Sequence, residues 1–338
     1  MPPFTDKPRF IERGGEMVLR QPIACNRTRM YNFLVDADWD ALVRLCDQSF
    51  REPSRGAVVM RPLVPAVMIV AADIQHGCSR NPVDGQKGWS KERDLGFWVP
   101  VARGRFDDGD PDDFEPDAFR IEQIGWYQPY LFIDNPAAVF VGRETFGFQK
   151  AFATCTMPSD ATHPSRFAVE TLVIDTFTPS TQARVEELYR LERADGGVLG
   201  ALETSVETFG DLVFETTKRL ATHFFGRSGL PMPTWQLLKN LRASIADALV
   251  PMFFLRQFRD VAEPDRACYQ AIIEAAADMT DWRGGGFLDE HVLTIRDCAS
   301  HPIARDLGLP SGPIETGFGF WADFDFEIGK GKELWRAP

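Results

Sequence analysis

The sequence predicts a protein of the α+β class, in which a body rich in strands carries separate helical segments. Runs of Val, Ile and aromatic residues, separated by clusters of Pro, Gly or Asp, dominate residues 1–180. Residues 181–248 differ, because their apolar residues recur at helical spacing with acidic residues between them. A chain of 338 residues is long enough for one large domain with an insertion or for two domains. We predict one domain over residues 1–338, with a helical insertion at 181–248.

Five strands and one helix are expected before the insertion. The helix is predicted at 38–46, where Asp38 can cap the first turn and the apolar side chains that follow share one face. The strands are predicted at 23–35, 57–72, 95–101, 125–153 and 167–177.

After the insertion, the pattern predicts a strand, a helix and a final strand. MFFLRQF (252–258) has strand character, and RACYQAIIEAAADM (266–279) is predicted to be helical. GFGFWADFDFEIG (317–329) alternates, which predicts a strand with one dry and one wet face. The residues expected on the dry face are Phe318, Phe320, Ala322, Phe324 and Phe326. The residues expected on the wet face are Trp321, Asp323, Asp325 and Glu327.

The charge and the cysteine pattern exclude several classes of partner. A formal net charge of -12 argues against nucleic acid or an anionic membrane, since both require a basic surface. The N-terminal residues contain no apolar signal-peptide core, and no apolar run approaches the roughly 18 residues of a membrane helix. The six cysteines are scattered and are expected to be free thiols in a reducing compartment, which predicts a cytoplasmic protein.

Common cofactor and metal motifs are not found in the sequence. The glycine-rich stretches match neither a dinucleotide fingerprint nor a phosphate-binding loop, and no GxSxG elbow is present. The five histidines form no zinc-binding spacing, and the acidic loop 105–117 lacks the order of an EF-hand. We therefore expect no metal and no cofactor.

One lysine stands out in the segment GRETFGFQKAFA (142–153). If the segment is a strand, Lys150 shares a face with Phe146, Phe148 and Phe152. Two interpretations are open at this point. The lysine can lie at a sheet edge and extend past its neighbours to water. Alternatively it is buried, and desolvation lowers its pKa from the free value of about 10.4 and makes it a nucleophile toward ketones.

The longer stretch DNPAAVFVGRETFGFQKAFA (134–153) resembles the active-site segment of the acetoacetate decarboxylase family. That segment has the form D-N-x-x-A-x-x-x-G-R-E, a short aromatic spacer and then Pro-Lys-Lys. Residues 36–48, 252–282 and 323–331 resemble further parts of the family. The residues in step with the motif are Asp134, Asn135, Ala138, Gly142, Arg143, Glu144 and Lys150.

The resemblance implies a cone-shaped β-barrel with packed helices, assembled as a homo-oligomer, that needs no cofactor. It also implies that Lys150 forms a Schiff base with a small keto acid. Gln149 replaces the family's proline and Ala151 replaces its second lysine, so the neighbouring phenylalanines alone would have to lower the pKa of Lys150.

The resemblance also suggests partners for Lys150. An arginine that holds the substrate carboxylate aligns between Arg27 and Arg29. One carboxyl for proton transfer aligns at Asp94, with Glu92 on the same strand face, whereas the other aligns near Val70, in a range (53–91) without glutamate. We expect Lys150, Arg29, Asp94 and Glu92 to be catalytic. The residues expected to contact substrate are Arg27, Phe146, Phe148 and Gln149.

Three functions remain open from the sequence. The first is decarboxylation of a β-keto acid through Lys150. The second is aldolase–dehydratase or hydratase–cyclase chemistry with the same lysine, which the missing glutamate and the missing second lysine favour. The third is a ligand-binding protein in which the lysine has no catalytic role.

Overall fold

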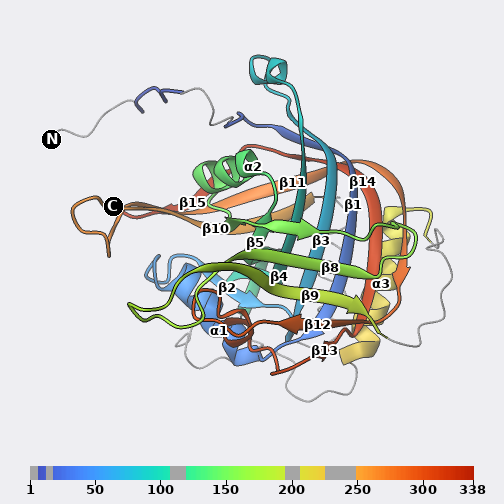
Figure 1. Cartoon of the computed structure of the whole chain (residues 1–338). Coiled ribbons are helices and arrows are strands. Elements are labelled where there is room, and N and C mark those ends of the chain that lie inside the picture. The colour runs from blue at the N-terminus through green and yellow to red at the C-terminus, as the bar shows by residue number, and fades with distance from the viewer. Residues whose placement is uncertain (1–6, 13–17, 107–118, 195–205, 225–248) are drawn as a thin grey trace.

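The architecture is a closed ring of strands with a second sheet packed against one flank (Figure 1). The computed structural model describes residues 7–12, 18–106, 119–194, 206–224 and 249–338. The ring closes because β4 pairs with both β3 and β5. Its seven strands are β1 (Ile23–Asp36), β3 (Ala66–Ser79), β4 (Ser90–Phe106), β5 (Phe119–Ile133), β10 (Leu249–Arg259), β11 (Ala267–Leu288) and β14 (Phe318–Ile328).

Three short strands extend this sheet outside the ring, and five others form the second sheet. β2 (Val59–Pro62) pairs with β4, β6 (Lys150–Phe152) with β5, and β15 (Lys332–Arg336) with β11. The second sheet has the order β13-β12-β9-β8-β7. Its strands are β7 (Thr154–Thr156), β8 (Arg166–Val173), β9 (Arg184–Arg193), β12 (His291–Ile295) and β13 (Ile314–Glu315).

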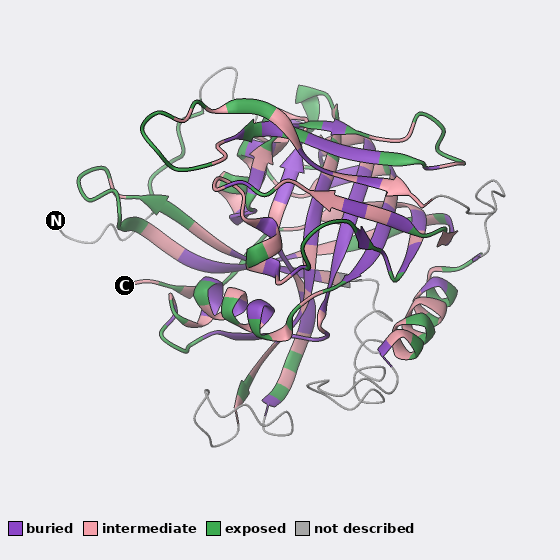
Figure 2. Ribbon diagram, turned by 60° about the horizontal axis from the view of Figure 1, so that its bottom comes forward, coloured by how far each residue is buried: buried purple, intermediate pink, exposed green. Residues whose placement is uncertain are grey.

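Each ring strand divides its side chains between two cores, because successive residues of a strand point to opposite faces. In β1, Phe33 faces outward and packs edge-on against Phe167 of β8, with ring centroids 5.4 Å apart. Asn32 and Leu34 face inward and line the interior of the ring. Figure 2 shows buried residues running along the central strands. The outer faces therefore bind the second sheet, and the inner faces enclose a pocket.

The helices are short and sit at the ends of strands. They are α1 (Trp39–Cys46), α2 (Pro136–Val141), α3 (Phe209–Phe224) and α5 (Ile303–Leu307), with π-helical turns η1 (Asp47–Arg51) and η4 (Gly142–Phe146) and a 3-10 turn η2 (Asp84–Lys87). The predicted cap of α1 is confirmed, because Asp38 Oδ1 accepts a hydrogen bond of 2.8 Å from the Ala41 N–H. None of the helices in the described part of the chain is long and apolar enough to cross a membrane.

Three predicted elements are wrong. The range 57–72 is not one strand, since β2 ends at Pro62 and β3 begins at Ala66. The predicted helix 266–279 is instead part of strand β11, which is paired with both β10 and β14. A strand between two cores carries an almost continuous apolar run, which periodicity does not distinguish from a buried helix. The range 125–153 is not one strand, since α2 and η4 separate β5 from β6.

The predicted helical insertion (181–248) is helical only in part. Residues 184–193 form β9 at the centre of the second sheet, and α3 is helical as expected. Residues 195–205 and 225–248 of the predicted insertion lie outside the described residues, as does most of the acidic loop 105–117. On β14, Trp321 was expected on the wet face but is buried, because the second sheet covers this part of the ring.

Candidate active site

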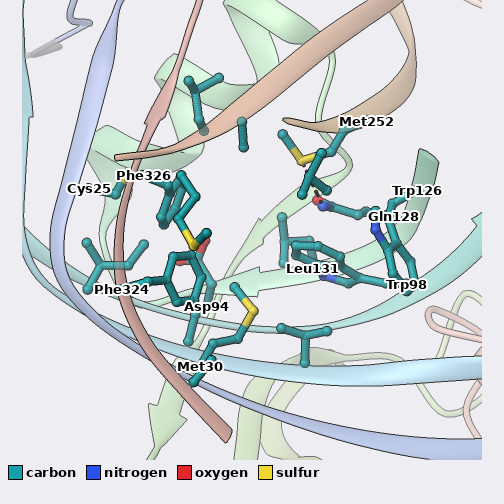
Figure 3. A pocket seen from close by; sticks show the side chains of 18 of the residues that line it. Cys25, Met30, Asp94, Trp98, Trp126, Gln128, Leu131, Met252, Phe324 and Phe326 are labelled. Atoms are coloured by element: carbon teal, nitrogen blue, oxygen red, sulfur yellow. Dashed lines mark hydrogen bonds between the residues drawn. The ribbon is translucent and has the colours of Figure 1, made fainter. Parts of the chain in front are cut away.

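A pocket of about 350 Å³ occupies the interior of the ring (Figure 3). All seven ring strands contribute side chains to its wall, together with α2 and α3. Most of the lining side chains are apolar. Among the described lining residues, the charged ones are Lys87, Glu92, Asp94 and Lys150.

Lys150 enters this pocket from β6, the strand paired in parallel with β5. Its side chain is buried, with 8% of the residue exposed, and Nζ lies 5.2 Å from the centre of the Phe148 ring. Gly142 leaves room for it, because a β-carbon there would lie 2.6 Å from Lys150 Cδ and 3.4 Å from Nζ. The motif glycine is thus a steric requirement of the lysine's position.

The segment before Lys150 is tied to the neighbouring strand β4 by side-chain hydrogen bonds. Asn135 caps α2 by accepting from the N–H groups of Ala137 and Ala138. Its amide nitrogen donates to Ser90 Oγ and to the Lys91 carbonyl of β4, at 3.0 and 2.8 Å. These bonds hold the lysine segment beside the strand that carries Glu92 and Asp94.

Arg143 fixes the far end of the same segment. Its Nη1 donates a hydrogen bond of 3.0 Å to the Lys150 carbonyl. Gly147, at φ 86°, provides the turn into β6, and a β-carbon there would lie 2.6 Å from Arg256 Cα. Several residues of the motif therefore position Lys150 and do not face the pocket themselves.

Asp94 is the nearest acidic partner of Lys150. Asp94 Oδ2 lies 4.0 Å from Lys150 Nζ, and Oδ1 is buried without a hydrogen-bond partner in the described structure. Glu92, two residues earlier on β4, lines the same pocket. The structure thus places the Lys150 amine and the carboxyl groups of Asp94 and Glu92 in one apolar cavity.

The charges of this cluster depend on one another. Burial lowers the pKa of Lys150, but the carboxylates of Asp94 and Glu92 raise it, and the net direction is upward. Burial raises the pKa of Asp94 well above its ordinary value, Glu92 raises it further, and Lys150 opposes the rise. The expectation that phenylalanines alone lower the amine's pKa is therefore wrong, because the acidic neighbours were left out of it.

A neutral amine is nevertheless accessible within the pair. Transfer of the proton from Lys150 to Asp94 turns an ion pair into two neutral groups without exchange with solvent. Burial disfavours charge on both residues, so the apolar pocket lowers the free energy that this proton transfer costs. Asp94 can then act as the acid that accompanies a nucleophilic amine.

Solved structures match this fold over nearly the whole chain. No family model matches the sequence, and no curated protein gives a significant match. Acetoacetate decarboxylase from Legionella pneumophila matches with a TM-score of 0.58 and 14% identity, covering 98% of this chain and 94% of that one. A second acetoacetate decarboxylase structure matches with a TM-score of 0.52 and 12% identity, covering 95% and 92%. The chain has the acetoacetate decarboxylase fold.

An enzyme named for another pathway shares this fold. The enduracididine biosynthesis enzyme MppR, in complex with pyruvate, matches with a TM-score of 0.50 and 13% identity, covering 94% of this chain and 92% of that one. The acetoacetate decarboxylase fold thus occurs in enzymes with different names. At these identities the likeness establishes the fold and leaves the reaction to the residues of the pocket.

The two arginines expected in the site do not line the pocket. Arg29 lies on the outer face of β1, where it forms two hydrogen bonds with Asp323, at 2.7 and 2.5 Å, and covers the Trp321 ring. Arg27 is exposed in a β-bulge with φ 52°. Before the bulge, odd-numbered residues such as Cys25 face the pocket. The extra residue reverses the alternation, so that even-numbered residues such as Met30 face the pocket after it. In this chain, the bulge in β1 therefore turns both arginines away from Lys150.

Two aromatic residues of the predicted face line the pocket, and two other expected residues do not. Phe146 and Phe148 are buried against Phe254 and contribute to the wall. Gln149 is exposed, since its neighbour Lys150 points inward and successive strand residues alternate. Phe152 is 59% exposed at the edge of the sheet, so the predicted row of three phenylalanines does not form.

Trp98 and Gln128 are among the polar residues of the pocket wall that sequence reasoning missed. Gln128 is almost fully buried, at 1% exposure, within the aromatic strand GWYQPYLF. A lone amide in such a strand is a signal for a buried polar contact, because an amide is seldom fully buried.

Proposed function

We propose that this protein is a Schiff-base-forming lyase that acts on a keto acid through Lys150. The observation that carries the proposal is the buried Lys150 amine, 4.0 Å from Asp94 in an apolar pocket. The shared fold supports it, since acetoacetate decarboxylase and the pyruvate-bound MppR are built on the same architecture. A buried amine beside a buried acid is suited to carbonyl addition, which needs a neutral nucleophile and a proton donor.

The covalent steps follow from these groups. The neutral Lys150 amine adds to the substrate carbonyl carbon. One proton from the amine nitrogen and one from Asp94 then convert the former carbonyl oxygen into leaving water. The product is an iminium ion, which carries the positive charge that Asp94 and Glu92 stabilise. The iminium then accepts the electron pair of a bond that breaks at the neighbouring carbon.

Decarboxylation of a β-keto acid is the first candidate outcome. The bond between the α-carbon and the carboxylate breaks, its electron pair forms an enamine, and carbon dioxide leaves. A proton from solvent, delivered through Asp94 or Glu92, adds to the α-carbon. Water then hydrolyses the iminium to release the ketone and Lys150, and the proton that is set free returns to Asp94. A carboxylate is poorly solvated in an apolar pocket, which favours a transition state with dispersed charge.

Aldol and dehydration chemistry is the second candidate outcome, and a specific observation favours it. MppR, which shares this fold, has been solved in complex with the condensation product of pyruvate and imidazole 4-carboxaldehyde, a product of two carbonyl compounds. In this outcome, the enamine attacks a second carbonyl compound, and the carboxylate of the keto acid is retained. Asp94 and Glu92 would then shuttle protons during addition and loss of water.

Borohydride trapping tests the proposal and separates the outcomes. The protein is incubated with 2-oxo and 3-oxo acids and reduced, and the adduct is measured by intact-mass and peptide analysis. We expect an adduct on Lys150 with at least one acid. A trapped ligand that is lighter by carbon dioxide indicates decarboxylation. A ligand that keeps its carboxylate and gains the mass of a second carbonyl compound, or loses water, indicates aldol or dehydration chemistry.

Two lysine variants show whether the adduct is specific. Lys150→Ala should lose the adduct while remaining folded. Lys87→Ala should keep it, because Lys87 lines the same pocket but forms ion pairs with Asp84 and Glu12 at 2.9 and 3.2 Å. Absence of any adduct in folded wild-type protein would instead favour a ligand-binding protein without catalysis.

A further inference from the structure

The pocket has a second polar region away from Asp94 (Figure 3). Trp98, Trp126, Gln128 and Met252 lie together there, and Leu131 separates them from the side that holds Asp94 and Cys25. Trp98 and Trp126 meet edge to face with ring centroids 5.8 Å apart, and Trp126 is paired with Met252 across β5 and β10. Nothing in the proposed chemistry at Lys150 uses these residues.

Gln128 presents an unpaired acceptor in this region. It is 1% exposed, its Nε2 donates to Met252 Sδ at 3.3 Å, and its Oε1 is buried without a partner in the described structure. The thioether sulfur is an acceptor with no proton, so the amide nitrogen must face Met252. Both residues line the pocket, and no described group of the protein pairs with the oxygen.

Trp98 presents an unpaired donor in the same region of the pocket (Figure 3). Its Nε1 is also buried without a hydrogen-bond partner among the described residues. The pairing of β4 with β5 shifts between Phe97 and Val99, which places Trp98 opposite the stretch that contains Gln128. One buried donor and one buried acceptor therefore adjoin the same apolar space.

The geometry points to a subsite for a hydroxyl group, carried on the hydrophobic part of the substrate. A hydroxyl donates one hydrogen bond and accepts others through a single oxygen, so it can serve Gln128 Oε1 and Trp98 Nε1 together. A carboxylate only accepts and would face the amide oxygen without a proton, and an ammonium only donates and would leave the indole N–H unpaired.

The separation of the two regions sets the size of the ligand. Lys150 is paired with Leu131, and Gln128 lies three residues earlier on β5, which corresponds to about 10 Å along a strand. Apolar side chains line the space between. The substrate class is thus a ketone or keto acid with an aromatic ring or a chain of several carbons, and with a hydroxyl at the end remote from the carbonyl. Only the position of the substrate carbonyl at Lys150 rests on the proposed function; the position of the hydroxyl rests on Gln128 and Trp98.

Matched ketones test the subsite through Lys150. Borohydride trapping is titrated with 4-(4-hydroxyphenyl)butan-2-one and with 4-phenylbutan-2-one, which lacks only the hydroxyl. We expect half-maximal trapping at a concentration about tenfold lower for the phenol, because only that ligand pairs both buried groups. Gln128→Met and Trp98→Phe keep the shape of the wall and should each reduce this preference severalfold. Both variants are needed, so that misfolding of one leaves the other informative.

Matched ligands without a carbonyl test the subsite independently of Lys150. Binding of 4-propylphenol and propylbenzene to the wild-type protein is measured by calorimetry, and the phenol should bind about tenfold more tightly. A preference for the phenol without any trapped ketone would support the subsite and count against the Schiff base. Equal binding of the matched ligands, as expected if ordered water serves Gln128 and Trp98, would overturn the subsite. A preference that survives in both variants would also overturn it.

Discussion

Gly142 and Lys150 occupy one space, since a β-carbon on the glycine would lie 2.6 Å from Cδ of the lysine. The glycine sits at the start of η4, directly after α2, and the lysine side chain passes across it into the pocket. The distance is well below a normal carbon–carbon contact, so any larger residue at 142 must displace the lysine or the turn.

Gly142→Ala should therefore abolish efficient Schiff-base formation while the fold is retained. Displacement of a reacting group by about 1 Å can reduce a rate about 100-fold, and trapping yields should fall to that extent. The matched control is Gly329→Ala, since a β-carbon there meets no atom within 4 Å. Unchanged trapping in Gly142→Ala would show that the lysine reacts from another position.

Asp94→Asn should lower the pKa of Lys150. Among the groups that raise this pKa, Asp94 is the largest, and the lowering by burial persists when its charge is removed. At neutral pH, a larger fraction of the Lys150 amine is then neutral in the variant than in the wild-type protein. Labelling of Lys150 by a small uncharged acylating reagent should therefore become severalfold faster. Its pH profile should move toward lower pH. Asp73→Asn is the control, because Asp73 lies on β3 outside the pocket wall. If the pH profile of Asp94→Asn moved upward or stayed in place, the assigned electrostatic coupling between Asp94 and Lys150 would be refuted.

Asn135→Ala should destabilise the protein and slow trapping together. Loss of a helix cap costs about 0.5–2 kcal/mol, and here the bonds from α2 to β4 are lost as well. Asp38→Ala removes the cap of α1 and should cost a similar free energy of unfolding, but it should leave the trapping rate unchanged. Equal trapping rates in the two variants would mean that Asn135 stabilises the fold without positioning Lys150.

Phe167→Ala should be strongly destabilising, because Phe167 is fully buried between the ring and the second sheet. Truncation of a buried phenylalanine costs about 3–5 kcal/mol, which chemical denaturation would detect. Phe177→Ala is the control, since Phe177 is 73% exposed and its truncation should change stability by less than about 0.5 kcal/mol. A small effect at Phe167 would indicate that the second sheet contributes little to the stability of the ring.

The sequence was sufficient to predict features that depend on local chemistry and strand periodicity. The α+β class, the Asp38 cap and the dry face of β14 all follow from residue type and spacing. Such features are short-range, because a cap needs one turn and alternation needs only a pleated strand. The acetoacetate decarboxylase fold, expected from the motif, agrees with the matching solved structures.

Other features depend on contacts between residues far apart in the chain. One bulge in β1 turns Arg27 and Arg29 away from the pocket, and periodicity alone does not reveal where a strand gains a residue. Pairing with β10 and β14 makes 267–288 a strand despite its helix-forming alanines, because tertiary packing overrides local propensity. The upward pKa of Lys150 and the unpaired groups of Gln128 and Trp98 arise in the same way, from neighbours that only the closed ring brings together.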